Sequence, residues 1–204
     1  MRLGVFGGTF DPIHLGHLAA AEEAAYRLDL DPVLFVPAHH QPLKEQAPRV
    51  SDADRLAMVT LAIEGNPHFA VSTVELERPA PSYTVETLRH LRQTYGDAAS
   101  GCELYFLLGI DSANTLDRWH EPAALLGLAR LVVMSRGKVP EPDWELLQRI
   151  DPALPIRERV VALAVPDVDV SARDLRRRIA AGEPVRYQLP EPMRAYIEQR
   201  RLYK

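Results

Sequence analysis

The sequence predicts an α/β fold built on a single doubly wound parallel sheet. Short apolar segments alternate with helical patterns from end to end, an order typical of a parallel sheet with right-handed crossovers. The chain has 204 residues, of which 47% are hydrophobic, so one domain with a sizeable core is expected. We predict a single domain over residues 1–204, in which residues 171–204 form a C-terminal helical part that completes the site.

The composition argues against several classes of function. The formal net charge of −4 gives no global basic field that would gather nucleic acid. Cys102 is the only cysteine, so no intrachain disulfide can form, as is usual in a reducing cytosol. The apolar N-terminal run is too short for a signal peptide, and no stretch approaches membrane-spanning length. We expect a cytoplasmic protein without nucleic-acid or membrane partners, for which a homo-oligomer is a possible state.

The first predicted strand, Leu3–Phe6, runs into a glycine turn and then a helix. Gly7 and Gly8 let the backbone come close to a ligand and aim N–H groups at it. His14 and His17 follow on the first helical turn, whose free N–H groups and partial positive charge suit an anion. This strand–turn–helix unit predicts a phosphate-binding site to which the two imidazoles add donors.

Other interpretations of the same residues remain open. The glycines could form an ordinary tight turn, the two histidines could lie on the helix surface, or the histidine pair could hold a metal ion. A catalytic metal normally needs a third ligand, and this stretch offers only Asp11. We favour the phosphate interpretation because it uses every unusual residue, and we expect no protein-bound metal.

The second strand is predicted at Pro32–Val36, and it leads into the proline-flanked loop Pro37–Lys44. Lys44 is a candidate phosphate donor, and a solvated loop lysine is an equally good interpretation of the sequence alone. Ser51 starts the next predicted helix, which has a weak capping box. The alternating segment Phe69–Leu76 predicts the third strand.

The next predicted helix is Thr84–Tyr95. The segment Pro81-Ser82-Tyr83-Thr84 leads into it and places hydroxyl and free N–H groups at its start. Spacing alone favours a plain N-cap there. The fourth strand, Glu103–Leu108, lacks alternation, as expected when both faces are covered. After it, Gly109 and Asp111 occupy a position where such sheets meet a nucleotide ribose or a cation, with helix capping by Asp111 as the alternative.

Trp119 lies among polar neighbours, which indicates either a lid over the core or a stacking platform for a flat ring; by itself the pattern favours the core. The remaining predicted elements are a strand at Leu131–Met134, a loop at Arg136–Glu145, a short helix at Trp144–Ile150 and a strand at Val160–Val165.

A helix with clear signals at both ends follows the last predicted strand. Ser171 is a natural N-cap, and Gly182 ends the helix. Four arginines fall within its first two turns: Arg173, Arg176, Arg177 and Arg178. Arginines early in a helix oppose its dipole, which favours a bound anion over the alternative of a solvated charged face. The final predicted helix, Glu191–Leu202, looks structural.

In a doubly wound sheet the ligand crevice lies beyond the carboxyl ends of the strands. Four of the segments described above follow predicted strands and can share that crevice: Gly7–His17, Pro37–Lys44, Gly109–Asp111 and Ser171–Arg176. The chain has neither a Walker A sequence nor G-x-G-x-x-G, so phosphate binding here follows another design.

The segment His14-Leu15-Gly16-His17 resembles the H-x-G-H motif of a nucleotidyltransferase superfamily. Longer segments are similar to the bacterial nicotinate-nucleotide adenylyltransferases, namely GGTFDPIHLGH, PSYTVETL (Pro81–Leu88), GIDSANTLDRW (Gly109–Trp119), VSARDLR (Val170–Arg176) and the tail Leu189–Tyr203. The resemblance spans nearly the whole chain and implies a Rossmann-like nucleotidyltransferase fold.

The resemblance implies an enzyme of NAD biosynthesis that transfers the adenylyl group of ATP, carried with Mg²⁺, to nicotinate mononucleotide. The implied catalytic residues are His14, His17 and Arg176. The implied ATP-binding residues are Gly7, Gly8, Thr9, Phe10, His14, Gly16, His17, Gly109, Asp111, Ser171 and Arg176. The implied nicotinate-nucleotide-binding residues are Thr9, Lys44, Tyr83, Thr84, Trp119 and His120, with Trp119 stacked on the pyridine ring.

Two segments depart from the pattern of that family. The serine- and threonine-rich Ser-Ser-Thr-x-Ile-Arg is replaced by Ser171-Ala172-Arg173-Asp174-Leu175-Arg176, so Arg173 stands where a small hydroxyl residue is usual. The loop that often reads Pro-Pro-His-Lys or Pro-Pro-His-Arg is Gln41-Pro42-Leu43-Lys44 and lacks the histidine.

Rival functions are compatible with the same residues. The nearest are adenylyl transfer to nicotinamide mononucleotide or to phosphopantetheine, since a carboxylate and an amide differ little in shape. A rival of another class is a nucleotide-binding sensor that retains the fold without chemistry. The two histidines and the pair Ser171 and Arg176 argue against such a sensor.

Overall fold

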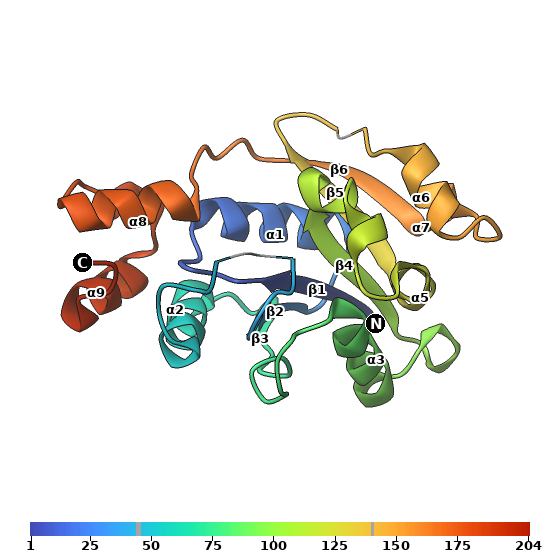
Figure 1. The fold of residues 1–204 in the computed structure, drawn as a ribbon, viewed down its shortest axis with the longest axis horizontal. Coiled ribbons are helices and arrows are strands. Elements are labelled where there is room, and N and C mark those ends of the chain that lie inside the picture. Colours follow the sequence, from blue (N-terminus) through green and yellow to red (C-terminus); the bar gives the residue numbers. More distant parts are fainter. Residues whose placement is uncertain (44–45, 140) are drawn as a thin grey trace.

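The central sheet is the feature that positions everything else in this chain. The computed structural model describes residues 1–43, 46–139 and 141–204. Within them, six parallel strands form one sheet in the order β3-β2-β1-β4-β5-β6 (Figure 1). The predicted doubly wound sheet is confirmed, and its winding reverses between β1 and β4, where such sheets hold their ligands. The strands are β1 (Arg2–Gly8), β2 (Val33–Pro37), β3 (Phe69–Val71), β4 (Glu103–Gly109), β5 (Arg130–Arg136) and β6 (Val160–Val165).

Each face of the sheet carries its own apolar core, because successive strand side chains point to opposite faces. In β4, Tyr105 and Leu107 belong to one core, and Leu104, Phe106 and Leu108 belong to the other. The first core is completed by α1 (Leu15–Leu28), α2 (Asp52–Ile63), α8 (Ala172–Ala181) and α9 (Glu191–Arg200). The second core is completed by α3 (Thr84–Tyr95), α5 (Pro122–Leu128), α6 (Trp144–Ile150) and α7 (Ile156–Arg159).

The C-terminal helices lie at the end of the sheet that the strands run toward. In Figure 1 the chain starts at the right of the sheet, and α8 and α9 lie at the left, beyond the carboxyl end of β1. A single turn, α4 (Ile110–Ala113), follows β4 at the same edge. Short 3₁₀ segments occur at η1 (Ala98–Ser100), η2 (Leu116–Arg118) and η3 (Arg186–Gln188). None of the helices in the described residues is long and apolar enough to span a membrane.

The third strand is shorter than the sequence predicts. Pairing stops after Val71, and the expected second half of Phe69–Leu76 is a turn in which Leu76 N–H donates to the Thr73 carbonyl at 2.8 Å. The neighbouring strand β2 ends at Pro37, which has no N–H group to extend a ladder. Alternation beyond Val71 therefore reflects burial of Val74 in the core, and the predicted strand is wrong over that half.

Several helices begin and end at the capping residues that the sequence predicts. Ser51 Oγ accepts the Asp54 N–H at 3.1 Å and caps α2, as predicted. Gly182 ends α8 with a φ of 70°, in the left-handed region that favours glycine. The final helix α9 stops at Arg200, two residues before the predicted end. The short helices α5 and α7 are not predicted, because each gives too few residues for a periodic pattern.

Candidate active site

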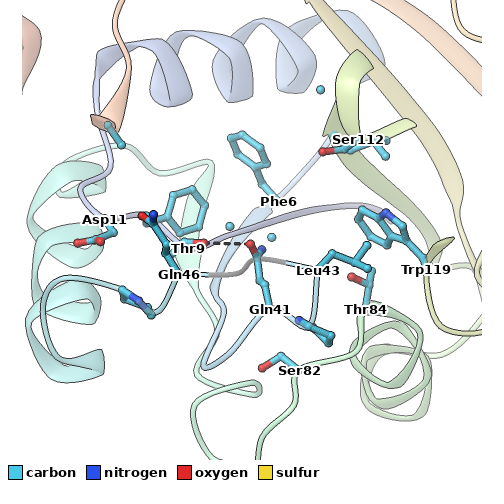
Figure 2. A pocket seen from close by; sticks show the side chains of 18 of the residues that line it. Phe6, Thr9, Asp11, Gln41, Leu43, Gln46, Ser82, Thr84, Ser112 and Trp119 are labelled. Atoms are coloured by element: carbon cyan, nitrogen blue, oxygen red, sulfur yellow. Dashed lines mark hydrogen bonds between the residues drawn. The ribbon is translucent and has the colours of Figure 1, made fainter. Parts of the chain in front are cut away.

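A cavity of about 1040 Å³ opens at the carboxyl ends of β1 and β4 (Figure 2). Figure 2 shows Trp119 and Thr84 on one side of it, Asp11 on the other, and Phe6 and Thr9 between them. The cavity brings together these residues of the predicted site: Gly7, Gly8, Thr9, Phe10, His17, Tyr83, Thr84, Gly109, Trp119, His120 and Arg176. Four predicted residues do not line it, namely His14, Gly16, Asp111 and Ser171. Lys44 lies outside the described residues.

The turn after β1 has a fixed shape because Phe10 folds back over it. Phe10 has a φ of 48°, rare for a non-glycine residue, and its ring packs edge-on against Phe6 at 5.8 Å. A Cβ added to Gly8 would lie 2.9 Å from the Phe10 ring, so any larger residue there would displace the ring. Beside the turn, the Thr9 hydroxyl donates to the Gln41 amide oxygen at 3.0 Å (Figure 2). The turn thereby presents its backbone to the cavity.

A buried cation holds this turn from behind. Arg55 is 0% exposed, and its guanidinium donates to the Thr9 and Ala38 carbonyls, each at 2.6 Å. Asp52 supplies the opposing charge, with its Oδ1 2.5 Å from Arg55 Nη2. Because the two carbonyls belong to the segments after β1 and β2, Arg55 joins the ends of neighbouring strands at the rim of the cavity.

The two histidines are stacked, with ring centroids 3.8 Å apart, but they are not equivalent. His14 precedes α1 as its N-cap, and its backbone N–H lies 3.3 Å from Nδ1 of His17. A neutral His17 that accepts this bond on Nδ1 must carry its proton on Nε2. His17, which lines the cavity, is therefore a hydrogen-bond donor at Nε2.

His14 is buried, with 4% of its surface exposed. Burial, aided by the nearby positive charge of Arg136, lowers the pKa of His14 to about 4, so the ring is neutral at pH 7. Its Nδ1 has no hydrogen-bond partner among the described residues. A Cβ on Gly16 would lie 3.1 Å from this Nδ1, so the glycine of H-x-G-H leaves room for the imidazole.

The arginines at the start of α8 divide into two groups. Arg177 and Arg178 form ion pairs with Asp174 and Glu183. Arg173 and Arg176, one helical turn apart, line the cavity instead. Two of the four arginines therefore lie where an anion in the cavity would meet them, and the other two belong to a solvated charged face.

Ser171 caps α8, as the sequence predicts: its Oγ accepts the Asp174 N–H at 3.2 Å. Arg176 is fixed from one side, because its Nη1 donates to the Asp11 carbonyl at 2.5 Å. Arg173 has no ion pair in the described part of the chain, although it stands beside Arg176 in the cavity wall. The sequence includes Arg173 among the four arginines that favour a bound anion, without a specific contact for it.

Aromatic rings and the start of α3 form the other end of the cavity. Trp119 packs edge-on against Phe106 at 6.0 Å and is only partly buried, so it serves both as a cover for the core and as a wall of the cavity. The Tyr83 ring is tilted by 31° to the His120 ring, with the centroids 4.2 Å apart. This end offers a flat apolar surface beside a helix start.

The N-cap residue of α3, Tyr83, makes no side-chain capping hydrogen bond in the part of the chain that the structure describes, contrary to the plain N-cap that spacing favours. The Ser82 hydroxyl is turned away and accepts the His39 N–H at 3.2 Å. Thr84, the first residue of α3, lines the cavity. Asp111 lies within α4 and makes no capping hydrogen bond to it, so helix capping by Asp111 is wrong.

Several lining residues were not predicted from the sequence. They are Phe6, Arg49, Ser82, Phe106, Ser112, Thr115 and Arg118, among others, whereas Asp11, Gln41 and Arg173 lie in segments that were predicted to share the crevice. Ser112, Thr115 and Arg118 follow the predicted Gly109–Asp111 segment at helical spacing, which is a signal that could have found them. Arg49 comes from the long connection after β2 and carries no comparable signal.

Comparisons with known proteins identify relatives of this chain over its full length. Residues 5–178 match the model of the family described as cytidylyltransferase-like. A probable nicotinate-nucleotide adenylyltransferase of Thermomicrobium roseum is 47% identical over 203 residues, covering 100% of this chain and 92% of the relative. Its counterpart in a Roseiflexus species is also 47% identical, covering 99% of this chain and 98% of the relative. The structure of Plasmodium falciparum nicotinic acid mononucleotide adenylyltransferase complexed with NaAD matches with a TM-score of 0.74 at 17% identity, over 99% of this chain and 97% of that one, which is a likeness of fold.

Proposed function

This chain belongs to the cytidylyltransferase-like family, and on that premise we propose that it transfers the adenylyl group of ATP to nicotinate mononucleotide in NAD biosynthesis. The products are nicotinate adenine dinucleotide and pyrophosphate. The observation that carries the proposal is the division of one cavity into a donor-rich end and an aromatic end. The names of relatives that are 47% identical over the full chain support the same choice of substrates.

In the proposed reaction, a 5′-phosphate oxygen of nicotinate mononucleotide attacks the α-phosphorus of ATP. A new P–O bond forms, and the bond between the α-phosphorus and the bridging oxygen to the β-phosphorus breaks, so pyrophosphate leaves with that electron pair. The nucleophile is already an anion at neutral pH and needs no side-chain base. The protein must hold two negatively charged reactants together and stabilise the charge that develops on the transferring group.

The donor-rich end suits the phosphates of ATP. The Gly8–Thr9 turn lines the cavity beyond β1, and His17, a donor at Nε2, lines it from α1. Arg173 and Arg176 face it from α8, where they suit the β- and γ-phosphates that leave as pyrophosphate. His14 belongs to this set as the residue that stacks on His17 and fixes its tautomer.

The aromatic end suits the pyridine nucleotide. Trp119 offers its face for stacking on the pyridine ring. The open start of α3 at Thr84 and the backbone near His120 offer N–H groups for the ring carboxylate, so that no arginine is required. Discrimination between acid and amide then depends on whether those donors meet two oxygens or an oxygen and an NH₂ group.

Mg²⁺ belongs to the proposal as part of the substrate. The described residues contain no group of three or more His, Cys, Asp or Glu side chains that could hold a metal ion. Mg²⁺ usually binds to phosphates and keeps several waters, and it would neutralise charge on the pyrophosphate. We place the reaction in the cytoplasm, where the free and buried thiol of Cys102 stays reduced.

One assay tests the proposal. ATP and Mg²⁺ are incubated separately with nicotinate mononucleotide, nicotinamide mononucleotide and phosphopantetheine, and dinucleotide (or dephospho-coenzyme) and pyrophosphate are measured. We expect the highest kcat/KM with nicotinate mononucleotide. A higher value with either other acceptor would reassign the substrate, and no pyrophosphate with any of them would favour a non-catalytic sensor.

A further inference from the structure

Asp11 is a point where three distant segments meet at the wall of the cavity. It is 6% exposed and lines the cavity. The Tyr203 hydroxyl donates to its Oδ1 at 2.7 Å, and the Arg49 backbone N–H donates to its Oδ2 at 2.8 Å. Arg176 Nη1 donates to its carbonyl oxygen at 2.5 Å. Tyr203 therefore ties the C-terminal tail to the turn after β1.

The contacts of Arg176 depend on how the Asp11 carboxylate is satisfied. Arg176 Nη1 lies 3.8 Å from Oδ2, so the two opposite charges are close without sharing a hydrogen bond. Each carboxylate oxygen already accepts a hydrogen bond, one from Tyr203 and one from Arg49. In the described residues Arg176 donates to the Asp11 carbonyl alone, and the rest of its guanidinium remains available to the cavity.

We propose that Tyr203 is a positioning residue, whose hydroxyl satisfies Asp11 and so keeps Arg176 directed at the phosphates in the cavity. Without that hydroxyl, Oδ1 of a buried carboxylate would lack its donor, and in the described residues Arg176 is the cation that lies within 4.0 Å of this carboxylate, at 3.8 Å from Oδ2. A guanidinium drawn onto Asp11 would leave the phosphates. The inference rests on the proposed function only in taking ATP as the source of those phosphates.

Tyr203 is suited to this role because it stays a donor. Burial, followed by the neighbouring Asp11 charge, raises the pKa of its phenol, so it keeps its proton throughout the physiological range. The groups that face it include Asp11, Arg176, Arg55 and the Met58 sulfur. Among them Asp11 is the acceptor of its short hydrogen bond.

The same segment offers a matched control. The Tyr196 hydroxyl donates to Asp54 Oδ1 at 2.9 Å, which is also a tyrosine–aspartate bond between the C-terminal helices and the body of the protein. Asp54 is buried like Asp11 but does not line the cavity. Tyr196→Phe therefore removes a tyrosine–aspartate bond without touching the wall that faces the phosphates, and Arg200 Nη2 stays 3.4 Å from the same Asp54 oxygen.

The test measures ATP affinity by calorimetry for the full chain and for Tyr203→Phe, Tyr196→Phe, Arg176→Ala and the double variant Tyr203→Phe/Arg176→Ala. We expect Tyr203→Phe to weaken ATP binding by about tenfold and Tyr196→Phe to change it by less than about twofold. In the Arg176→Ala background, removal of the Tyr203 hydroxyl should have no further effect. A purely structural role for Tyr203 would instead give the same loss in both backgrounds.

A rescue variant keeps the test decisive if Tyr203→Phe folds poorly. Asp11→Asn removes the charge that would capture Arg176, so Asp11→Asn/Tyr203→Phe should bind ATP more tightly than Tyr203→Phe alone. Unchanged ATP affinity in Tyr203→Phe, equal losses in Tyr203→Phe and Tyr196→Phe, or no rescue by Asp11→Asn would each overturn the proposal. Because calorimetry uses ATP alone, absence of turnover with nicotinate mononucleotide would refute the proposed function and leave this result standing.

Discussion

His17 receives the His14 backbone N–H on Nδ1, and this one bond decides which ring nitrogen carries a proton. The donor at Nε2 then belongs to a residue that lines the cavity, whereas the neighbouring imidazole is buried. Residues of the same type, three positions apart, thus have different surroundings. In the proposed reaction His17 contacts the ligand, and His14 holds the His17 ring in place.

We predict that His17→Ala lowers kcat by about a hundredfold or more, because one donor to the developing charge is lost. The measurement is steady-state turnover of ATP with nicotinate mononucleotide, with thermal unfolding as the check on folding. His90→Ala, on the exposed side of α3 and away from the cavity, is the control. Turnover of His17→Ala near that of the control would remove His17 from the mechanism.

Arg173 can be tested against a neighbour with the same side chain. Arg173 lines the cavity, whereas Arg177 is held by Asp174 and Glu183. We predict that Arg173→Ala weakens binding of ATP and pyrophosphate by about tenfold, since a charge-assisted hydrogen bond to phosphate is lost. Calorimetry should show little change for Arg177→Ala. Equal losses of ATP and AMP affinity in Arg173→Ala would contradict a contact with the β- and γ-phosphates.

Among the contacts between elements, we expect those of the buried Arg55 to contribute more to the free energy of unfolding than a surface ion pair does. It extends from α2 and joins the segments after β1 and β2 through two backbone carbonyls. Its charge is compensated by Asp52. Arg89 also pairs with two carboxylates, Glu86 and Glu121, but these three side chains are 37%, 46% and 42% exposed.

We predict that Arg55→Ala destabilises the protein by about 2–6 kcal/mol, because it leaves the Thr9 and Ala38 carbonyls without their donor, at about 1–3 kcal/mol each, whereas Asp52 keeps His39 as a partner. Urea unfolding gives the free energy of unfolding directly. Arg89→Ala is the control and should change it little, since solvent screens that pair. If the two variants proved equally stable, the buried guanidinium would not be what fixes the glycine turn.

At the scale of the whole molecule, the parallel sheet brings the carboxyl ends of its strands to one side of the molecule, and the C-terminal segment packs against that side. Tyr203 and Arg176 reach Asp11 across most of the length of the chain. Residues 171–204 therefore contribute to the cavity through Arg173 and Arg176, and support its wall through Tyr203.

Stability of the whole molecule should depend on pH through His14. Its folded pKa is about 4, against about 6.5 when unfolded, so between these values the unfolded chain binds more protons. The stabilisation that comes from a neutral, buried His14 is therefore complete above about pH 6.5. As the pH falls, the free energy of unfolding declines, by about 2 kcal/mol at pH 5. Urea unfolding at pH 7 and pH 5 should show this loss in the native protein and a smaller one in His14→Gln. An equal loss in both would assign the acid sensitivity to other groups.

The sequence by itself determined the alternation of strands and helices, the glycine turn with its two histidines, and the caps at Ser51, Ser171 and Gly182. These features depend on local backbone preference and on the period of apolar residues, which are readable from neighbours in the chain. For the same reason the prediction overextended β3 to Leu76, because alternation reports burial and does not report whether a partner strand is still present.

Only the tertiary structure decided which of the predicted residues face one another. It places His17 at the cavity and buries His14 behind it. Of four similar arginines, two line the cavity and two pair with carboxylates. The Ser82 hydroxyl is turned away from α3. The tertiary structure also brought Tyr203 and Arg55 to the turn after β1. Contacts of this kind join residues far apart in the chain, and they depend on how whole elements pack, for which a linear pattern holds no signal.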